Sequence, residues 1–492
     1  MIAKAARICL AVGTSVVMLA TACSNDQEMP PTVGASPSTQ PPVAAPRSTP
    51  APIAAPTPDL PGVSKLINDA IAAHQLPGAV VVVGHGGDIV FHRAYGERKL
   101  AGEPGLDGSP APAEPMTEDT IFDIASLTKP LATATAVMQL YEQGKVRFDD
   151  PVQQYLPDFN AGNDPARAEV TVRMLLTHTS GEPGDVNLGD PWGLEEPDRA
   201  EGFHRALTTP LVSGPGIGFR YSDINFILLG GLVEKLTGET EDAYAQQNVF
   251  GPLGMHDTRF LPAAKACGPH TMRGAAIAWA PGRLPDECSP GTWDIGLLPR
   301  IAPTARDEEN RGDPSKNPDL DHLLRGTVQD TTARRMGGVA GHAGVFSTGR
   351  DVGVFAQSLL DRLAGRPSEF PLQQDTLALM TSPQQPGHSG DQIEAANEAM
   401  AAGADRHPAI AGQSLRGFGW DIDSPFSQAR GTVFPIGSFG HTGFTGTTLW
   451  LDPRSNTYVI LLTNSIHTRG SPPIAYLSGE VATAVAQALN LQ

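Results

Sequence analysis

Apolar, β-branched runs lie at both ends of this chain, and helical patterns fill the stretch between them. Residues 78–83 and 89–95 flank a Gly-rich turn, which predicts a β-hairpin. Residues 447–452 and 458–464 predict a second hairpin, and residues 475–491 a last helix. We therefore expect an α/β (α+β) fold: an antiparallel sheet built from the N- and C-terminal strands, flanked by helices, with an inserted mostly helical lobe.

The N-terminus has the features of an export signal. Lys4 and Arg7 precede an apolar run over residues 8–20, which is too short to span a bilayer, and small residues then precede Cys23. This pattern resembles a bacterial lipoprotein signal over residues 1–22, with cleavage before Cys23 and lipidation of its thiol. The alternative is an ordinary signal peptide with an incidental cysteine. The favoured interpretation predicts an exported protein, lipid-anchored to a membrane of the bacterial cell envelope.

Composition separates a tether from a catalytic body. Residues 23–61 are crowded with Pro, Ala, Ser and Thr and almost lack large apolar side chains, so we expect a disordered tether. Residues 62–490 are long enough for one large catalytic domain, and we expect a monomer. The net charge of −18 excludes a nucleic-acid partner, because its field repels phosphate.

Two cysteines remain in the exported body, Cys267 and Cys288. Export permits a disulfide between them, and two buried free thiols are the alternative. The chain has no His-Glu-x-x-His pair and no Cys-x-x-Cys pair, and His178 and His342 are better explained as packed, hydrogen-bonded residues. We therefore predict no metal site and no cofactor.

Ser126 and Lys129 are the strongest candidates for chemistry. Three residues apart at the start of an Ala-rich helical pattern, they share one face, so the Lys129 amine can reach the Ser126 hydroxyl. An amine desolvated enough to be partly neutral can take the serine proton, and a helix N-terminus favours a developing oxyanion. A capped helix start with an exposed lysine is the alternative.

Two further segments complete a pattern. Tyr221-Ser222-Asp223 precedes an apolar helix, and His441-Thr442-Gly443 precedes a strand-like run. With Ser126-x-x-Lys129, in this order, they resemble the three motifs of the serine β-lactamase and penicillin-binding protein superfamily. The resemblance covers about residues 62–490. Residues 175–181, 249–255, 337–348 and 417–420 look like signatures of its class-C-like branch, which includes esterases, D-aminopeptidases and D-alanyl-D-alanine carboxypeptidases.

The resemblance implies a covalent ester on Ser126, with proton transfer shared by Lys129 and Tyr221. Which of the two acts first is left open. It also implies an oxyanion hole from the backbone N–H groups of Ser126 and Phe444, and an active site in a cleft between sheet and helical lobe. The expected substrate-binding residues are Asp223, His441, Thr442 and Gly443.

Two positions depart from the superfamily pattern. Asp223 stands where asparagine is usual, and His441 stands where penicillin-binding proteins have lysine. Both changes reduce positive potential in the cleft, because a carboxylate replaces an amide and a histidine replaces a permanent cation. They argue against β-lactam hydrolysis and favour ester or amide substrates that lack an essential carboxylate or carry an amine.

The sequence thus predicts an envelope-anchored serine hydrolase, an esterase or a D-amino-acid peptidase or carboxypeptidase, acting on a small-molecule or peptide substrate derived from the cell wall. A β-lactamase, or a penicillin-recognising or cell-wall-binding lipoprotein without turnover, is the alternative. Retention of Ser126, Lys129 and Tyr221 together favours the enzyme. Three long irregular segments are either functional rims or mobile insertions, the first two expected beside the cleft: residues 181–201, 263–326 and 381–415.

Overall fold

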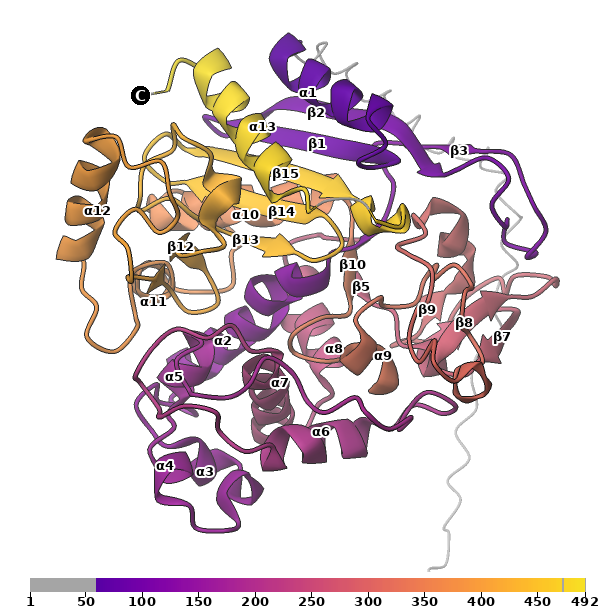
Figure 1. The fold of residues 1–492 in the computed structure, drawn as a ribbon, viewed down its shortest axis with the longest axis horizontal. Helices are drawn as coiled ribbons and strands as arrows, with labels where there is room; N and C mark the ends of the chain where they lie inside the picture. The colour runs from indigo at the N-terminus through magenta and orange to yellow at the C-terminus, as the bar shows by residue number, and fades with distance from the viewer. Residues whose placement is uncertain (1–58, 471–472, 492) are drawn as a thin grey trace, which may run out of the picture. The chain divides into compact units, whose positions relative to one another are not determined.

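The computed structural model describes residues 59–470 and 473–491 (Figure 1). The predictions for the signal segment, for Cys23 and for nearly all of the tether lie outside these residues. Residues 55–492 form one compact unit, and the described part of it is the catalytic body. Among the described residues, no helix is both long and apolar enough to cross a membrane.

The main sheet has eight strands in the order β11-β12-β13-β14-β15-β1-β2-β3. Their bounds are β1 (Gly78–His85), β2 (Asp88–Lys99), β3 (Glu114–Pro115), β11 (Leu415–Arg416), β12 (Asp421–Asp423), β13 (Phe439–Gly443), β14 (Thr447–Asp452) and β15 (Thr457–Thr463). All neighbouring strands pair antiparallel. Both predicted hairpins are confirmed, and β1 pairs with β15 with Val80 opposite Leu462, so the two chain ends build one sheet.

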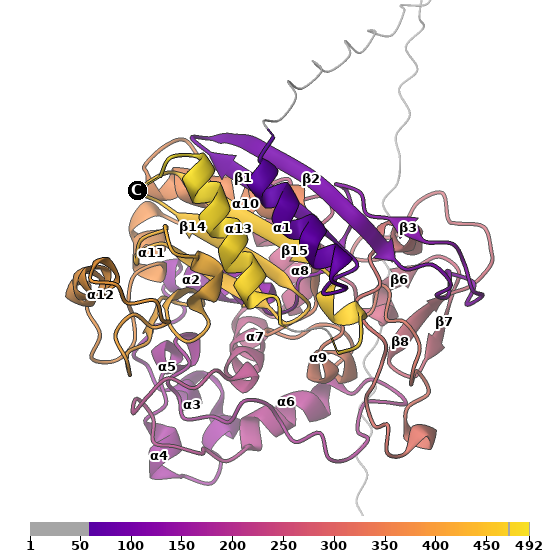
Figure 2. The same ribbon diagram turned by 45° about the horizontal axis from the view of Figure 1, so that its top comes forward.

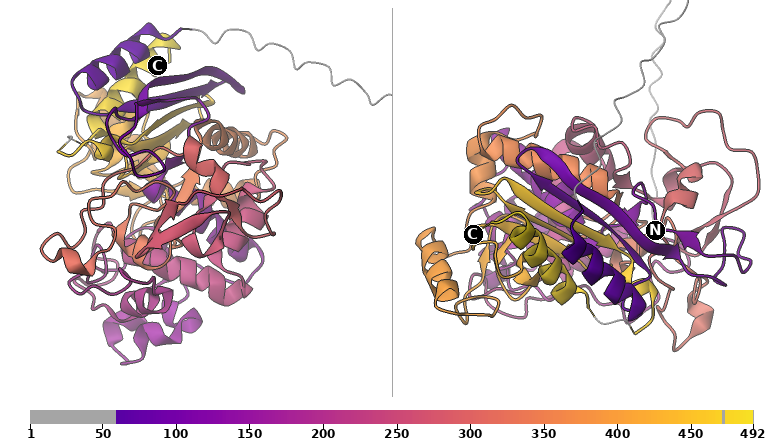
Figure 3. Two further views of the ribbon diagram at one scale, coloured as in Figure 1. Left: turned by 90° about the vertical axis from the view of Figure 1, so that its right-hand side faces the viewer. Right: turned by 90° about the horizontal axis from the view of Figure 1, so that it is seen from above.

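Helices cover both faces of this sheet. The N-terminal helix α1 (Pro61–Ala72) and the C-terminal helix α13 (Ala475–Ala488) lie side by side on one face (Figures 2 and 3). Their apolar residues pack against every second residue of β1, including Val81 and Val83. The alternate residues of β1 face the other way, into the larger core that contains α10 (Gly349–Leu363). The sheet is therefore apolar on both sides, which explains its continuous hydrophobic runs.

Most of the chain between β3 and α10 forms a mostly helical lobe below the sheet in Figure 1. Its helices are α2 (Thr135–Glu142), α3 (Val152–Tyr155), α4 (Pro165–Ala168), α5 (Val172–Leu176), α6 (Arg199–Thr208), α7 (Asp223–Thr237), α8 (Glu241–Ala245) and α9 (Thr331–Arg335). A small sheet of β4 (Phe122–Asp123), β10 (Val345–Ser347) and β5 (Arg259–Phe260) joins this lobe to the main sheet. Helix α7 is buried along most of its length, which explains its apolar sequence.

The second and third irregular segments have structure of their own. Residues 263–326 contain two short sheets, β6 (Ala266–Cys267) with β9 (Trp293–Asp294) and β7 (His270–Arg273) with β8 (Ala276–Trp279). A disulfide joins Cys267 to Cys288 within this segment. The third segment follows α11 (Gln374–Met380) and carries α12 (Asp391–Ala401).

Candidate active site

Ser126 lies on a strained turn between the small sheet and the helical lobe. It occupies a 3₁₀ turn, Ala125–Leu127, directly after β4, and its side chain is partly exposed. Ala125 has a φ of 45°, a left-handed conformation that residues other than glycine seldom adopt. The buried Asp123 carboxylate holds the turn, accepting hydrogen bonds from the Ala125 N–H at 2.9 Å and the Gln329 N–H at 2.8 Å. The hydroxyl is thereby presented at a fixed position.

Lys129 is completely buried, so the alternative of an exposed lysine at a helix start is wrong. It begins a π-helical turn, Lys129–Ala134, which leads into α2. Its Nζ donates hydrogen bonds to Ser126 Oγ at 2.9 Å, to Asp223 Oδ1 at 2.6 Å and to the His342 carbonyl at 3.1 Å. All three ammonium hydrogens have acceptors, so the amine is held against the nucleophile.

The charge state of Lys129 corrects one expectation from the sequence. Burial by itself lowers the pKa of this amine, but the Asp223 carboxylate and the Tyr221 phenol oppose burial and raise the pKa above its ordinary value. The resting amine is therefore an ammonium rather than a partly neutral base. The cause is Asp223, which binds Lys129 in this structure rather than standing free for substrate.

Tyr221 stands at the N-terminal end of α7, two residues before Asp223. Its ring stacks at 4.5 Å on the His178 ring, and Lys129 Nζ lies 4.9 Å from its centre. Burial raises the pKa of the phenol, although Lys129 acts to lower it. The phenol is therefore protonated at neutral pH and can donate a proton to a leaving group.

The His178 ring packs against the Tyr221 ring, a role that the sequence did not reveal. It has a φ of 57°, and its Nδ1 accepts hydrogen bonds from the Ser222 N–H at 3.2 Å and the Asn225 amide at 3.3 Å. Burial, with the nearby Arg416 and Lys129, holds the pKa of His178 far below its usual range. The ring is therefore a neutral platform under the tyrosine.

Strand β13 passes close to the nucleophile turn and carries His441, Thr442 and Gly443. A Cβ on Gly443 would lie 2.2 Å from Thr447 Oγ1 and 2.6 Å from the Ile124 carbonyl, so only glycine fits. The Thr447 hydroxyl donates to that same carbonyl, and Thr445 Oγ1 donates to the Asp123 carbonyl at 2.8 Å. These bonds place the turn that contains Phe444 beside Ser126, as an oxyanion hole from their N–H groups requires.

His441 is buried, and its Nδ1 donates to the Thr442 carbonyl at 2.8 Å. Burial, Arg416 and Lys129 hold its pKa far below the usual range, so the residue that replaces lysine is neutral. Arg416 on β11 was not predicted, because no local motif marks it. It is buried, lies 3.4 Å from the Asp421 carboxylate and over a phenylalanine ring, and its positive charge helps to lower the pKa of both His178 and His441.

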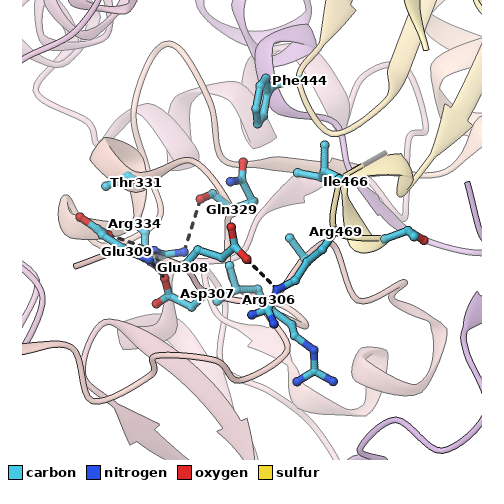
Figure 4. A pocket seen from close by; sticks show the side chains of 14 residues that line it. Arg306, Asp307, Glu308, Glu309, Gln329, Thr331, Arg334, Phe444, Ile466 and Arg469 are labelled. Atoms are coloured by element: carbon cyan, nitrogen blue, oxygen red, sulfur yellow. Dashed lines mark hydrogen bonds and ion pairs between the residues drawn. The ribbon is translucent and has the colours of Figure 1, made fainter. Parts of the chain in front are cut away.

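Parts of the first two irregular segments lie at the site. The Gly184 carbonyl accepts the Asp223 N–H at 2.7 Å. The second segment, with the end of the main sheet, lines a cavity of about 420 Å³ that also contacts Phe444 (Figure 4). The His342 ring contacts the Asp330 carboxylate, with 2.8 Å between His342 Nε2 and Asp330 Oδ1. Within residues 59–470 and 473–491, no group of three or more His, Cys, Asp or Glu side chains is arranged to hold a metal ion.

The site brings together a serine, an ammonium, a carboxylate and a phenol, the set needed to form and hydrolyse an acyl-serine. In comparisons with known proteins, the beta-lactamase family model matches residues 63–482. The N-acetylmuramyl-L-alanine amidase of Bacillus subtilis (strain 168) is 30% identical over 84% of this chain and 82% of its own. An Escherichia coli (strain K12) protein named "Putative D-alanyl-D-alanine carboxypeptidase" is 28% identical over 78% of this chain and 77% of its own.

Solved structures share the fold at lower identity. A mutant of simvastatin synthase from Aspergillus terreus aligns with a TM-score of 0.58 and 23% identity, covering 87% of this chain and 98% of its own. A class C beta lactamase aligns with a TM-score of 0.56 and 16% identity, covering 86% and 97% of the two chains. The chain belongs to the beta-lactamase family of serine hydrolases.

Proposed function

We propose that this protein cleaves the amide bond between a cell-wall sugar acid and a peptide, through an acyl-enzyme on Ser126. The arrangement of Ser126, Lys129, Asp223 and Tyr221 supports acyl transfer. The similarity to the N-acetylmuramyl-L-alanine amidase supports the substrate class. An esterase activity on small activated esters is expected of the same site, because an ester is the easier acyl donor.

The neutral His441 is the observation that selects this amide over a D-alanyl-D-alanine bond. A D-alanyl-D-alanine carboxypeptidase must hold a substrate carboxylate next to the scissile bond, and penicillins carry a carboxylate as well. Here burial and the positive charge of Arg416 keep His441 uncharged. A buried, neutral imidazole gives a carboxylate little stabilisation. A substrate without a free carboxylate at this position fits the cleft better.

The reaction we propose conserves protons within the site. Ser126 Oγ bonds to the amide carbonyl carbon, and the serine proton passes across the 2.9 Å bond to Lys129 Nζ in those molecules whose Lys129 ammonium has lost its proton to solvent. The N–H groups of Ser126 and Phe444 stabilise the oxyanion. The Tyr221 phenol protonates the departing nitrogen as the C–N bond breaks, and it regains a proton from the Lys129 ammonium. Water then attacks the ester carbonyl and gives a proton to the Lys129 amine, which passes a proton to the departing Ser126 Oγ.

We place the enzyme in the cell envelope, anchored by lipid on Cys23 and spaced from the membrane by residues 24–61. The support is the sequence pattern of the N-terminus. A substrate derived from the cell wall requires this side of the membrane.

A substrate panel tests the proposal. The full-length protein is incubated with N-acetylmuramyl-L-alanyl-D-isoglutamine, with a peptide that ends in D-alanyl-D-alanine, and with a penicillin, and the products are identified by mass. We expect release of the free dipeptide from the sugar amide with a kcat/KM at least about tenfold above that for D-alanine release. Faster release of D-alanine, or faster opening of the penicillin, refutes the proposal. The Ser126→Ala variant is the control for background hydrolysis.

A further inference from the structure

The cavity beside Phe444 has no role in the chemistry described above. It holds about 420 Å³, the size range of small-molecule sites, and is walled by the second irregular segment and the residues that follow β15. Figure 4 shows Phe444 and Ile466 on one side, Arg306, Glu308 and Arg469 on the other, and the Gln329 amide between them. The walls thus combine apolar and polar groups.

The cavity is coupled closely to the nucleophile. Gln329 belongs to its wall, and the Gln329 N–H donates to Asp123, the same carboxylate that holds the turn before Ser126. Phe444 belongs to the wall as well, and its N–H is half of the oxyanion hole. A substrate whose carbonyl oxygen lies in that hole therefore reaches the cavity with one of its two carbonyl substituents.

The position of the proton donor shows which substituent this is. The leaving amine takes its proton from Tyr221, so it lies where Tyr221 meets His441 and Phe426. None of these three residues lines the cavity. The other substituent of the carbonyl, the acyl side, points to the cavity.

The lining suits a neutral polar group better than an ion. Arg469 pairs with Glu308 through Nε at 2.6 Å and with Asp321 through Nη2, and the Arg306 guanidinium lies 3.9 Å from the Glu103 carboxylate, so opposite charges already offset each other. The Phe444 side chain is 73% exposed, an unusual state for a large apolar ring. An exposed aromatic face and planar polar side chains match the C–H face and the hydroxyl groups of a sugar ring.

We infer that this cavity is the acyl-side subsite and that it binds an N-acylated pyranose, with Phe444 against the ring and Glu308, Gln329 and Arg469 at its polar groups. The inference rests on the proposed function and deepens it, because it assigns the sugar of the substrate to the cavity beside Phe444 and the leaving peptide to the side of Tyr221. An acyl-side peptide is the competing occupant.

A pair of matched substrates tests the subsite. One is N-acetylmuramyl-L-alanyl-D-isoglutamine, and the other is the lactyl dipeptide that has the same scissile amide without the sugar. The variant is Arg469→Ala with Glu308→Ala, which removes both partners of one ion pair. Asp321, the other partner of Arg469, has a side chain that is 64% exposed, so water can solvate its carboxylate in the variant. The control is Arg283→Ala with Asp286→Ala. These residues form an ion pair in the second irregular segment, and their side chains are 84% and 88% exposed.

We expect the ratio of kcat/KM for the sugar substrate to that for the sugar-free substrate to fall about tenfold in the Arg469–Glu308 variant and to stay at the wild-type value in the control. Phe444→Ala should lower the same ratio, because it removes the ring proposed to contact the sugar. The backbone N–H of residue 444 remains, so cleavage of the sugar-free substrate should continue. An unchanged ratio overturns the subsite. Equal losses on both substrates also overturn it, because they place the peptide half in the cavity.

A binding measurement separates failure of the subsite from failure of the proposed function. If the wild type cleaves neither substrate, the proposed amidase activity is wrong, and the Ser126→Ala protein is titrated with the methyl ester of N-acetylmuramic acid by calorimetry. Binding that is lost in the Arg469–Glu308 variant supports the sugar subsite without turnover. No binding, or the same affinity in both proteins, overturns it.

Discussion

At the scale of single residues, Asp223 decides the protonation state of the site. Its carboxylate raises the pKa of Lys129, so the amine keeps its proton to higher pH and accepts the Ser126 proton less readily in acid. Asp223→Asn removes the carboxylate and lowers this pKa. The acid limb of the kcat/KM profile should therefore move to lower pH, by about one unit or more.

The profile is measured with a small activated ester, for which the chemistry is least demanding. Asp242→Asn is the matched control, because Asp242 pairs with Lys265 away from the site. An acid limb that stays in place in Asp223→Asn, with the protein folded, would show that Asp223 does not control the base.

Tyr221 is the proton donor in this account. Tyr221→Phe keeps the ring on His178 and removes only the hydroxyl, so turnover of the amide should fall by roughly 10²- to 10⁴-fold. Tyr476→Phe, at a side chain that is 79% exposed, should have no effect. Full amide turnover by Tyr221→Phe would assign the phenol a purely structural role.

The sequence predicted some of the active-site residues and contacts but not others. Ser126, Lys129 and Tyr221 belong to local motifs, and the structure places them in contact. The Lys129–Asp223 bond joins residues 94 positions apart, and this contact is the main reason why the pKa of the buried amine is raised. Arg416 lies on a strand of two residues just before the signature at 417–420, and nothing in the sequence shows that this strand brings its charge near His441.

At the scale of elements, the approach of β13 to the nucleophile turn sets the oxyanion hole. Gly443→Ala would put a methyl group into the Thr447 hydroxyl and the Ile124 carbonyl. We expect a loss of about 1–3 kcal/mol in the free energy of unfolding and at least about tenfold in kcat/KM, measured by denaturant titration and ester hydrolysis.

Gly162→Ala is the control, because a Cβ at Gly162 meets no atom within 4 Å. Wild-type stability and activity in Gly443→Ala would mean that β13 can shift without cost, which would contradict the tight contact at Gly443.

The two hairpins could be predicted from the sequence, because their strands are runs of β-branched and apolar residues on either side of a turn. The short strands of residues 263–326 did not, because segments of two to four residues carry too little periodicity.

At the scale of the whole molecule, strands from both ends of the described chain build one antiparallel sheet, as the sequence pattern predicted. The proposed sugar subsite is lined in part by residues 305–309 and 324, which belong to a segment that the sequence could identify only as irregular. Their lining of the cavity depends on contacts such as Arg469 with Glu308, which join parts of the chain more than 150 residues apart.

The proposed lipid anchor on Cys23 is also tested at this scale. Cys23→Ser should release the protein from the membrane fraction and leave ester hydrolysis unchanged, because lipid on the thiol supplies many buried CH₂ groups at about 0.8 kcal/mol each. Fractionation with activity assay in each fraction measures this, and Cys267→Ser with Cys288→Ser is the control for loss of cysteine. A Cys23→Ser protein that stays membrane-bound, or a wild type without acyl mass at its N-terminus, would contradict the lipoprotein interpretation.

The central claim is that Ser126 carries the acyl group. The most direct measurement is intact-mass and peptide-mass analysis after the protein has reacted with a fluorophosphonate and, separately, after acid quench during turnover of an activated ester. The account predicts one adduct, on the peptide that contains Ser126, and none in Ser126→Ala, while Ser109→Ala on an exposed turn labels as the wild type does. An adduct on another residue, or undiminished labelling and turnover in Ser126→Ala, would contradict it.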